Sequence, residues 1–311
     1  MTTPTLVHLV SDHPELSTLA QLLRRAFTGA GAGDGDPARS NRVTRIVLFA
    51  PGGDLCAVLA RPGAPLDLLV LTDHHEFDDT YAFQDAAERR LRTVAHRCAA
   101  VLPPIHLSVH ALGDANRQLA AGSRLLARVL AQGVVLDERP GVLVDPPADL
   151  SPEQVYCEAS AQNYACRDVA ANFLGRAAAE APRSRRKAAF LLHQAAEQAY
   201  ARVLRVLAFY APRTHDLGTL RRLAEPLAPE LADLWRDAGA RPETFVALQA
   251  AYGHRRAARG WSIDEDDLDE MTRGVEALLA GVDAVCRDTL AAVEALANAD
   301  QDIDGPQVWR A

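Results

Sequence analysis

The sequence predicts an α/β fold for the first part of the chain and an all-α fold for the second. Up to about residue 145, continuous apolar strands alternate with segments of helical periodicity, whereas no later segment has strand character. Residues 139–154, between the two parts, include four prolines, which favour extended and exposed chain. A length of 311 residues is also typical of two domains. We therefore expect one domain over residues 1–145 and another over residues 151–311.

The elements of the first part follow from its apolar periodicity. The expected helices cover residues 16–27, 78–102 and 115–133, and the expected strands cover residues 43–50, 66–72, 104–112 and 134–138. Gly133 stands where the third helix would end at a C′ residue. Strands this apolar need helices over the sheet, so an α/β domain follows.

The second part predicts a bundle of four or five helices. They are expected over residues 152–180, 186–210, 216–238, 242–258 and 265–298. Ser151 with Pro152 and Gln154 has the pattern of a capping box at the start of the first helix. In the last helix apolar residues recur at three- and four-residue spacing, which indicates a face packed on a core.

Composition narrows the classes of function. A formal net charge of −8 argues against bulk nucleic-acid binding, although local basic patches remain compatible with it. The five cysteines form no CxxC pair, which favours reduced thiols and a cytoplasmic location. No apolar run approaches the length of a membrane span, and the first residues lack the pattern of a signal peptide.

Candidate ligand-binding residues gather in the second part. His193, Glu197 and Tyr200 are spaced to share one face of a helix, where they would line a groove or form an internal hydrogen-bonded set. In the following turn, Thr214 is the expected N-cap of the next helix. His215 has no such structural role there, and it is the better ligand candidate.

Two basic clusters suit phosphate groups, because arginine can bind phosphate through two nitrogens. They cover residues 183–187 and 254–259, and the second contains Arg255 and Arg256. Tyr252 lies beside the second cluster and could stack on a base. The alternatives are solvated helix ends for the clusters and bundle packing for the tyrosine.

The segments KAAFLLHQAAEQAYARVLRVLAFYAPRTHDLGTL (187–220) and FVALQAAYGHRRAARGWSIDEDDLDEM resemble the HEPN family of helical bundles. The resemblance covers roughly residues 152–298 and implies nucleotide or RNA binding by a homodimer. Many members are metal-independent ribonucleases with Arg, four to six residues, then His, late in the bundle. Here AYGHRRAARGW has no His after its arginines, and the spacing from Arg186 to His193 lies in an early helix, so the usual site is not found.

The stretch FAPGGDLCAVLARPGAPLDLLV (49–70) resembles the motif region of minimal nucleotidyltransferases, which implies a mixed sheet with helices. The family's Gly-Ser turn is read here as Ala50-Pro51, or as Gly52-Gly53 in another register, and its Asp-x-Asp is read as Pro65-Leu66-Asp67. Asp67 is therefore the sole remaining motif carboxylate, and one carboxylate cannot hold two Mg²⁺ ions. We expect an inactive domain, with Mg²⁺ as cofactor only if that site is active.

The resulting hypothesis is a regulatory protein that binds a nucleotide or RNA and retains a degenerate nucleotidyltransferase-like domain. One alternative is an active nucleotidyltransferase or ribonuclease, of the toxin–antitoxin or defence type that the resemblance implies. Another is a dimeric interaction scaffold without a small ligand. The segment DHHEFDD (73–79) is read as the start of a helix rather than as a metal site, and no metal-binding residue is predicted.

Overall fold

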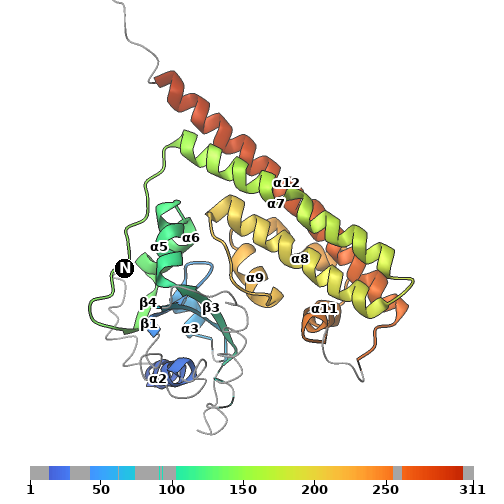
Figure 1. Ribbon diagram of the computed structural model, residues 1–311, viewed down its shortest axis with the longest axis horizontal. Coiled ribbons are helices and arrows are strands. Elements are labelled where there is room, and N and C mark those ends of the chain that lie inside the picture. The colour runs from blue at the N-terminus through green and yellow to red at the C-terminus, as the bar shows by residue number, and fades with distance from the viewer. Residues whose placement is uncertain are drawn as a thin grey trace, which may run out of the picture. The chain divides into compact units, whose positions relative to one another are not determined.

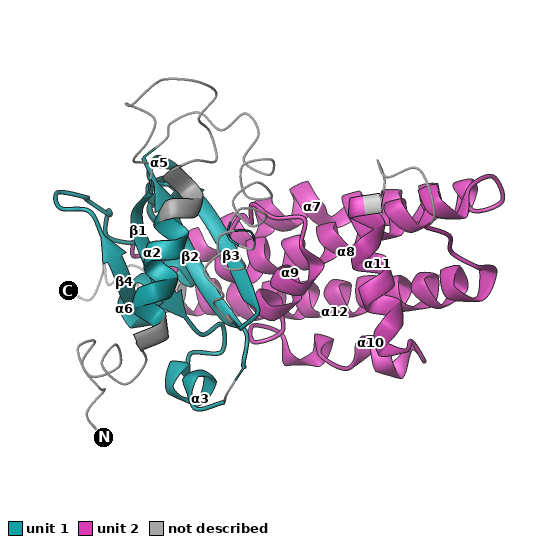
Figure 2. Ribbon diagram, turned by 90° about the horizontal axis from the view of Figure 1, so that it is seen from below, with its two compact units in different colours: residues 1–148 teal, residues 149–311 magenta. Residues whose placement is uncertain are grey.

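The computed structural model describes residues 14–28, 43–61, 63–73, 91, 93, 103–254 and 261–303. The chain divides into two compact units, residues 1–148 and 149–311, which are coloured separately in Figure 2. The predicted fold class is confirmed, because an α/β region with a mixed four-stranded sheet precedes an all-α bundle. No helix in the described ranges is both long enough and apolar enough to span a bilayer.

The N-terminal unit is built on a sheet with strand order β3-β2-β1-β4. Strand β1 pairs antiparallel with β2 and β4, whereas β2 and β3 are parallel. The elements in chain order are α2 (Pro14–Thr28), β1 (Val43–Phe49), α3 (Leu55–Leu59), β2 (Leu66–Thr72), β3 (Ile105–Ala111), α5 (Leu112–Ala120), α6 (Arg124–Gln132) and β4 (Val134–Glu138).

Helices cover both faces of this sheet, with α2 on one side and α5 and α6 on the other (Figure 1). Leu19 and Leu23 of α2 join a buried apolar cluster with Leu66 and Leu68 of β2. Because side chains alternate along a strand, Asp67 faces the opposite side from these two leucines. That side carries α5 and α6.

Two expectations for residues 115–133 were wrong. One helix was expected, but α5 and α6 are separated by a turn in which Gly122 has φ +80°. Gly133 is not left-handed, since its backbone is extended at φ −74° and ψ 162°. A glycine is needed there for another reason: a Cβ would overlap the Val129 carbonyl oxygen and the side chain of Val47. Of the helix expected over residues 78–102, only Leu91 and Thr93 are described, and both are helical.

The C-terminal unit is organised around the long helices α7, α8 and α12, which pack on one another (Figure 1). Its elements are α7 (Pro152–Glu180), α8 (Arg185–Ala208), α9 (Leu217–Ala224), the 3₁₀ turn η2 (Pro229–Leu231), α10 (Leu234–Asp237), α11 (Pro242–His254) and α12 (Glu265–Ile303). The capping box predicted at Ser151 and Gln154 is confirmed. Both α7 and α8, which pack on each other, bury several alanines, and small side chains allow close approach of two helices. They include Ala159, Ala170 and Ala177 of α7 and Ala188, Ala195 and Ala199 of α8.

The single helix expected over residues 216–238 was also wrong, because the chain there forms α9, η2 and α10 in succession. Pro226 and Pro229 explain the break, since proline lacks the N–H that a helix interior requires. The other predicted helices are present: α7 has the predicted bounds, α11 and α12 begin at the predicted residues, and α8 is shifted by one or two residues at its ends. Residues 255–258 of the fourth lie outside the described part of the chain.

Arg202 ties the three long helices together. This nearly buried side chain of α8 donates from Nη2 to Asn163 Oδ1 of α7 at 2.8 Å. Its Nη1 donates to Asp283 of α12. A guanidinium group suits this position because its donors are held in a fixed planar fork.

Candidate functional site

The candidate site begins on the buried face of α8. His193 and Glu197 are one helical turn apart, so their side chains project to the same side. Their exposed fractions are 0% and 4%. Burial of two polar groups on one helix face requires hydrogen-bond partners, because an unsatisfied buried group is costly.

His215 reaches Glu197 from the loop between α8 and α9. Its Nδ1 lies 2.8 Å from Glu197 Oε2, across 18 residues of sequence. The loop starts at Phe209, which ends α8 in the left-handed conformation with φ 49°. It ends at Asp216, whose carboxylate accepts a hydrogen bond from the backbone N–H of Thr219 and is the N-cap of α9. The cap was expected at Thr214, whose hydroxyl instead accepts from the backbone N–H of Asp216.

Neighbouring glutamines complete the surroundings of the Glu197 carboxylate. Gln194 Nε2 donates to Oε2 at 2.9 Å, and Gln198 Nε2 donates to Oε1 at 3.3 Å. Nδ1 of His193 lies 3.8 Å from Oε2, which is beyond hydrogen-bonding distance. Sequence reasoning missed Gln194, although its position one residue after His193 and three before Glu197 could have indicated it.

Tyr252 of α11 packs on both histidines. Its ring centroid lies 4.3 Å from that of His215 and 5.2 Å from that of His193, with an interplanar angle of 29° in each pair. Gln249, one turn earlier in α11, donates to Asp216 Oδ2 at 2.6 Å and fixes α11 against the loop. Tyr252 thus contacts protein rings in the position where the sequence suggested base stacking.

Among the two histidines and Glu197, His215 is the most exposed residue. Its side chain is 18% exposed, compared with 5% for Glu197 and 0% for His193. A carboxylate that holds an accessible imidazole is an arrangement suited to proton transfer or to hydrogen bonding with a polar ligand. We call His193, Glu197, His215 and Tyr252 the histidine cluster.

Tyr200, the third member of the predicted face on α8, lies in the core. Its side chain is fully buried, and its hydroxyl accepts a hydrogen bond from the indole N–H of Trp235 at 3.0 Å. We leave it out of the candidate site because full burial gives a ligand no access to it.

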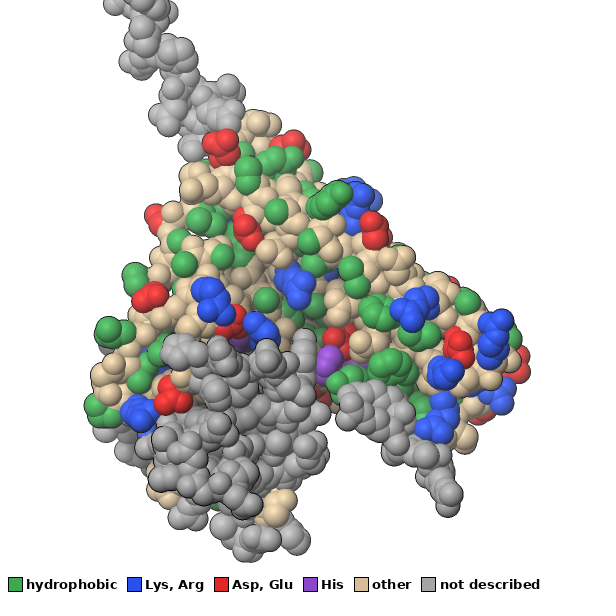
Figure 3. Space-filling view, in the orientation of Figure 1, with side chains coloured by type: hydrophobic (Ala, Val, Ile, Leu, Met, Phe, Trp, Pro, Cys, Tyr) green, Lys and Arg blue, Asp and Glu red, His purple; other side chains and the backbone are tan. Residues whose placement is uncertain are grey.

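Arg255 and Arg256, the remaining predicted binding residues, lie outside the described part of the chain. In the other basic cluster, residues 183–187, two side chains lie near carboxylates. Arg185 Nη1 is 3.9 Å from Glu265, and Lys187 Nζ is 3.3 Å from Glu180. On the face shown in Figure 3, basic side chains are interspersed with acidic and apolar ones. The carboxylates beside Arg185 and Lys187 favour a solvated helix end over a phosphate site at residues 183–187.

Asp67, the remaining motif carboxylate of the N-terminal unit, is 2% exposed and lies near the start of the inner strand β2. It pairs in register with Phe49 on β1 and with His106 on β3. Position 65, which would face the same side in an Asp-x-Asp motif, is a proline. Within the described ranges, no group of three or more histidine, cysteine or acidic side chains could hold a metal ion.

The turn after β1 also differs from a triphosphate site. Gly53 has φ +91°, and Asp54 follows it as the N-cap of α3, accepting from the Ala57 N–H at 2.8 Å. A carboxylate therefore occupies the helix end where an anionic phosphate would bind. The cavity beside this turn, lined in part by Phe49 and Arg128, holds about 10 Å³. A nucleotide needs some hundreds of Å³.

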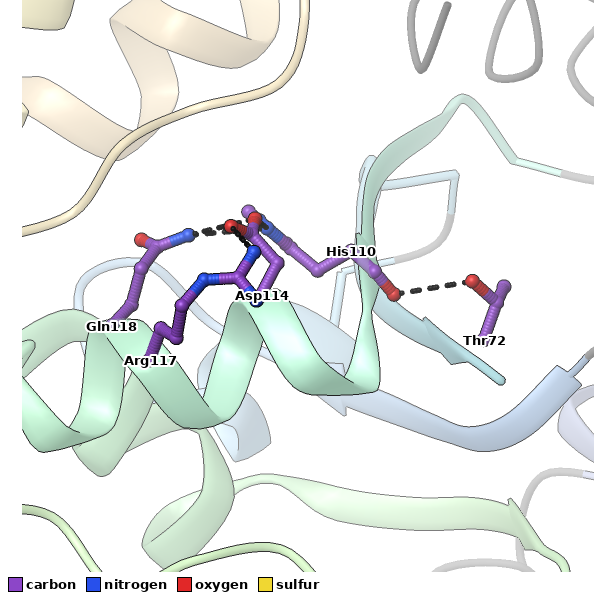
Figure 4. A network of polar contacts seen from close by, with 5 residues as sticks. All are labelled: Thr72, His110, Asp114, Arg117 and Gln118. Atoms are coloured by element: carbon purple, nitrogen blue, oxygen red, sulfur yellow. Dashed lines mark hydrogen bonds and ion pairs between the residues drawn. The ribbon is translucent and has the colours of Figure 1, made fainter. Parts of the chain in front are cut away.

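A polar network on β3 and α5 was not anticipated from the sequence (Figure 4). His110 is fully buried, with Nδ1 3.4 Å from Asp114 Oδ2. Asp114 also accepts from Gln118 Nε2 at 3.2 Å and from Arg117 Nη2 at 3.1 Å. Thr72 of β2 donates to the His110 carbonyl oxygen at 3.4 Å. The network joins the end of β3 to α5, and its signal in the sequence is the four-residue spacing of His110 and Asp114.

Two acidic groups have structural partners. Asp73, at the start of the DHHEFDD segment, pairs with Arg139 at 2.8 Å, and residues 74–79 lie outside the described part.

Near the start of α12 a cavity of about 420 Å³ is lined mainly by acidic residues. In its wall, Glu270 accepts hydrogen bonds from the backbone N–H and the side chain of Arg241. The hydrogen bonds between Arg241 and Glu270 attach the start of α11 to α12.

Comparison with known proteins assigns no family. No protein-family model matches the chain, and no curated protein matches it significantly.

Proposed function

We propose that the protein binds a nucleotide or RNA at the histidine cluster of a HEPN-like C-terminal unit. The observation that carries this proposal is the 2.8 Å contact between the nearly buried Glu197 carboxylate and the more exposed His215 imidazole. Both residues lie in the segment 187–220 that resembles the HEPN family, and Tyr252 lies in the second resembling segment. The cluster thus joins the parts of the chain on which the resemblance rests.

We also propose that the N-terminal unit is nucleotidyltransferase-like but does not catalyse nucleotidyl transfer. Asp67 has Pro65 in place of the motif's other aspartate, and the Asp54 carboxylate caps α3 at the turn. Two-metal transfer needs carboxylates that bridge both ions and a helix end open to phosphate. The described residues support neither requirement.

Thermal unfolding of the full chain tests the proposal with a panel of nucleotides and short RNAs, each with and without Mg²⁺. A ligand at about 100 times its Kd adds about 2.7 kcal/mol, which raises the Tm of a unit of this size by several degrees. We expect a Mg²⁺-independent increase that is retained in Asp67→Ala and lost in His215→Ala. The control is Glu294→Gln, an exposed carboxylate on α12.

Two other outcomes would contradict the proposal. A Mg²⁺-dependent increase that disappears in Asp67→Ala would restore the transferase alternative. The absence of any increase would favour the scaffold without a small ligand.

RNA cleavage is a second candidate function. It is favoured by the contact in which the Glu197 carboxylate orients the His215 imidazole, because general-base histidines are often held by a carboxylate in this way. In such a reaction the imidazole takes the proton of a 2′-hydroxyl, the 2′ oxygen bonds to phosphorus, and the 5′ oxygen leaves and is protonated by water. Incubation of labelled RNA with the wild type and His215→Ala in EDTA tests it. Cleavage products with a 2′,3′-cyclic phosphate, formed only by the wild type, are the expected result for a ribonuclease.

The resemblance further implies a homodimer formed through the bundle. Analytical ultracentrifugation of the full chain tests this assembly directly, and a monomer at all concentrations would contradict it.

A further inference from the structure

We infer that Gln249 and Asp216 are positioning residues of the histidine cluster. Their hydrogen bond fixes α11 in the orientation that lays the Tyr252 ring on the His215 ring, so that α11 and the loop before α9 behave as one unit. The positioning role stands on the contacts of these residues. Its consequence for ligand binding rests on the proposed function.

Two contacts between neighbouring residues join α11 to the loop. Gln249 Nε2 lies 2.6 Å from Asp216 Oδ2, and the amide is the donor because an ionised carboxylate only accepts hydrogen bonds. Three residues later in α11, the Tyr252 ring centroid lies 4.3 Å from that of His215, the residue before Asp216. Residues three apart on a helix are neighbours on its surface. The hydrogen bond and the ring contact therefore form adjacent points of one attachment, and together they limit rotation of α11 about its axis.

The loop side of this attachment is held independently of α11. Asp216 Oδ1 accepts from the backbone N–H of Thr219 at 2.6 Å and caps α9, while Oδ2 is the atom that meets Gln249. At the start of α11, Arg241 is attached to Glu270 of α12. Gln249 supplies a second polar attachment about two helical turns further along. With Asp216 held by α9, it is the second half of α11 that follows the hydrogen bond.

Apolar packing on α8 is the alternative cause of the same geometry. The Tyr252 ring also lies 5.2 Å from that of His193 and 6.3 Å from that of Phe190, and Leu248 and Ala251 of α11 are buried. Apolar contacts are non-directional, whereas a hydrogen bond tolerates only a narrow range of distance and angle. We therefore assign the orientation of the tyrosine ring to the hydrogen bond.

Exchanging the two partners separates these causes. Gln249→Glu places a second carboxylate against Asp216, and the repulsion of like charges should move α11 away from the loop. Adding Asp216→Asn restores a hydrogen bond of opposite direction, from an amide at position 216 to a carboxylate at position 249, and leaves the charge of the pair unchanged. Asparagine is also a preferred N-cap, so the start of α9 should be retained. Val246→Glu is the control, because it adds a carboxylate to α11 at a position that is 67% exposed.

Nuclear magnetic resonance measures the position of the tyrosine ring, because an aromatic ring shifts the signals of protons near its face. In the full chain with ¹³C-labelled histidines, the ring signals of His215 are assigned by their loss in His215→Gln, and Tyr252→Leu gives their position without the aromatic ring. We expect Gln249→Glu to move these signals towards those of Tyr252→Leu. The exchanged pair should return them to the wild-type position, and Val246→Glu should leave them there.

Two outcomes would overturn the positioning role. Wild-type His215 signals in a folded Gln249→Glu variant would show that packing on α8 suffices. Signals that stay displaced in the exchanged pair would show that the hydrogen bond is not the cause. Gln249→Leu removes the donor without adding a charge and should give the same displacement, which keeps the test valid if Gln249→Glu does not fold.

Calorimetric titration with the same panel of nucleotides and short RNAs tests the consequence for binding. We expect a ligand that raises the Tm of the wild type to bind Gln249→Glu about tenfold more weakly, the contribution of one hydrogen bond, and to bind the exchanged pair with wild-type affinity. Unchanged affinity in Gln249→Glu would overturn this consequence. If no member of the panel binds the wild type, the proposed function and the consequence for binding fail together, while the His215 signals still decide the positioning role.

Discussion

The hydroxyl group of Tyr200 illustrates how burial decides the role of a single residue. It accepts a hydrogen bond from Trp235 at 3.0 Å inside the bundle. Burial raises the pKa of Tyr200 well above its ordinary value, an effect partly offset by the Trp235 hydrogen bond. The phenol therefore stays neutral and acts as a structural acceptor.

Replacing Tyr200 by phenylalanine should destabilise the bundle. The indole N–H of Trp235 would lose its partner in a buried position, at a cost of about 1–3 kcal/mol. Thermal unfolding should show a Tm lowered by about 2–4 °C for each kcal/mol. Tyr156→Phe is the matched control, because that hydroxyl bonds Glu294 at 3.1 Å at the surface and its loss should change the Tm little. Equal effects of the two substitutions would contradict this account.

The histidine cluster shows how far residue-level prediction reaches. The spacing of His193 and Glu197 on one helix sufficed to place them together, because helix geometry is regular. The contact of His215 with Glu197 depends on the torsion angles of a loop, including the left-handed Phe209, and no periodicity encodes it. The position of Tyr252 depends on how α11 packs, so it too required the structure.

Two glycines within helices allow a test of how tightly the helices of the bundle pack. In α12, a Cβ at Gly274 would overlap the ring of Trp235, whereas a Cβ at Gly175 in α7 would meet nothing within 4 Å. Gly274→Ala should destabilise the protein, because overpacking costs about 1–3 kcal/mol and alanine regains only about 1 kcal/mol of helix propensity. Gly175→Ala should stabilise it by about 0.5–1 kcal/mol. Urea unfolding of the pair checks these signs, and stabilisation by both would show that Trp235 can move aside.

The contact of Glu270 with Arg241, which attaches α11 to α12, should make the stability of the bundle depend on pH. Hydrogen bonds from the side chain and backbone of Arg241 lower the pKa of Glu270 from 4.5 to about 2. The folded state therefore keeps this carboxylate ionised where the unfolded state protonates it. Its contribution to stability is complete above pH 4.5 and is lost as the pH falls towards 2.

Glu270→Gln should accordingly lower the urea midpoint at neutral pH, and its deficit against the wild type should shrink between pH 4.5 and about 2. Glu265→Gln is the control, since that side chain is 82% exposed and 3.9 Å from Arg185. A deficit that does not change with pH would contradict the coupling.

The elements were predicted where periodicity is strong and missed where single residues interrupt it. Strands β1, β2 and β4 and helix α7 follow directly from apolar runs and a capping box. The breaks at Gly122 and at Pro226 lie inside segments whose apolar spacing continues across them. There the backbone preferences of one residue outweigh the pattern of its neighbours.

At the scale of the whole molecule, the change from alternating elements to helices alone was enough to predict the fold class. The division into units at residues 148 and 149 gives each unit a hydrophobic core of its own. The resemblances to the HEPN family and to minimal nucleotidyltransferases each point to a family that contains enzymes. Composition and periodicity do not distinguish an enzyme from a binding protein. That decision lies with a few polar groups, as at Glu197 and Asp67.

Because each unit has its own core, we expect the two units to unfold separately. The positions of the tryptophans allow the unfolding of one unit to be followed by fluorescence. All three tryptophans, Trp235, Trp261 and Trp309, belong to the C-terminal unit, so indole fluorescence follows that unit while circular dichroism follows both. Leu68 is fully buried in the N-terminal core, and Leu68→Ala should cost that unit about 2–5 kcal/mol. We expect the transition detected by circular dichroism to broaden towards lower temperature while the fluorescence midpoint stays at its wild-type value. A nucleotide bound at the histidine cluster should raise the fluorescence midpoint and should broaden the circular dichroism transition towards higher temperature. If Leu68→Ala lowers both signals together, the two units unfold as one, and ligand binding in the bundle would then stabilise the α/β unit as well.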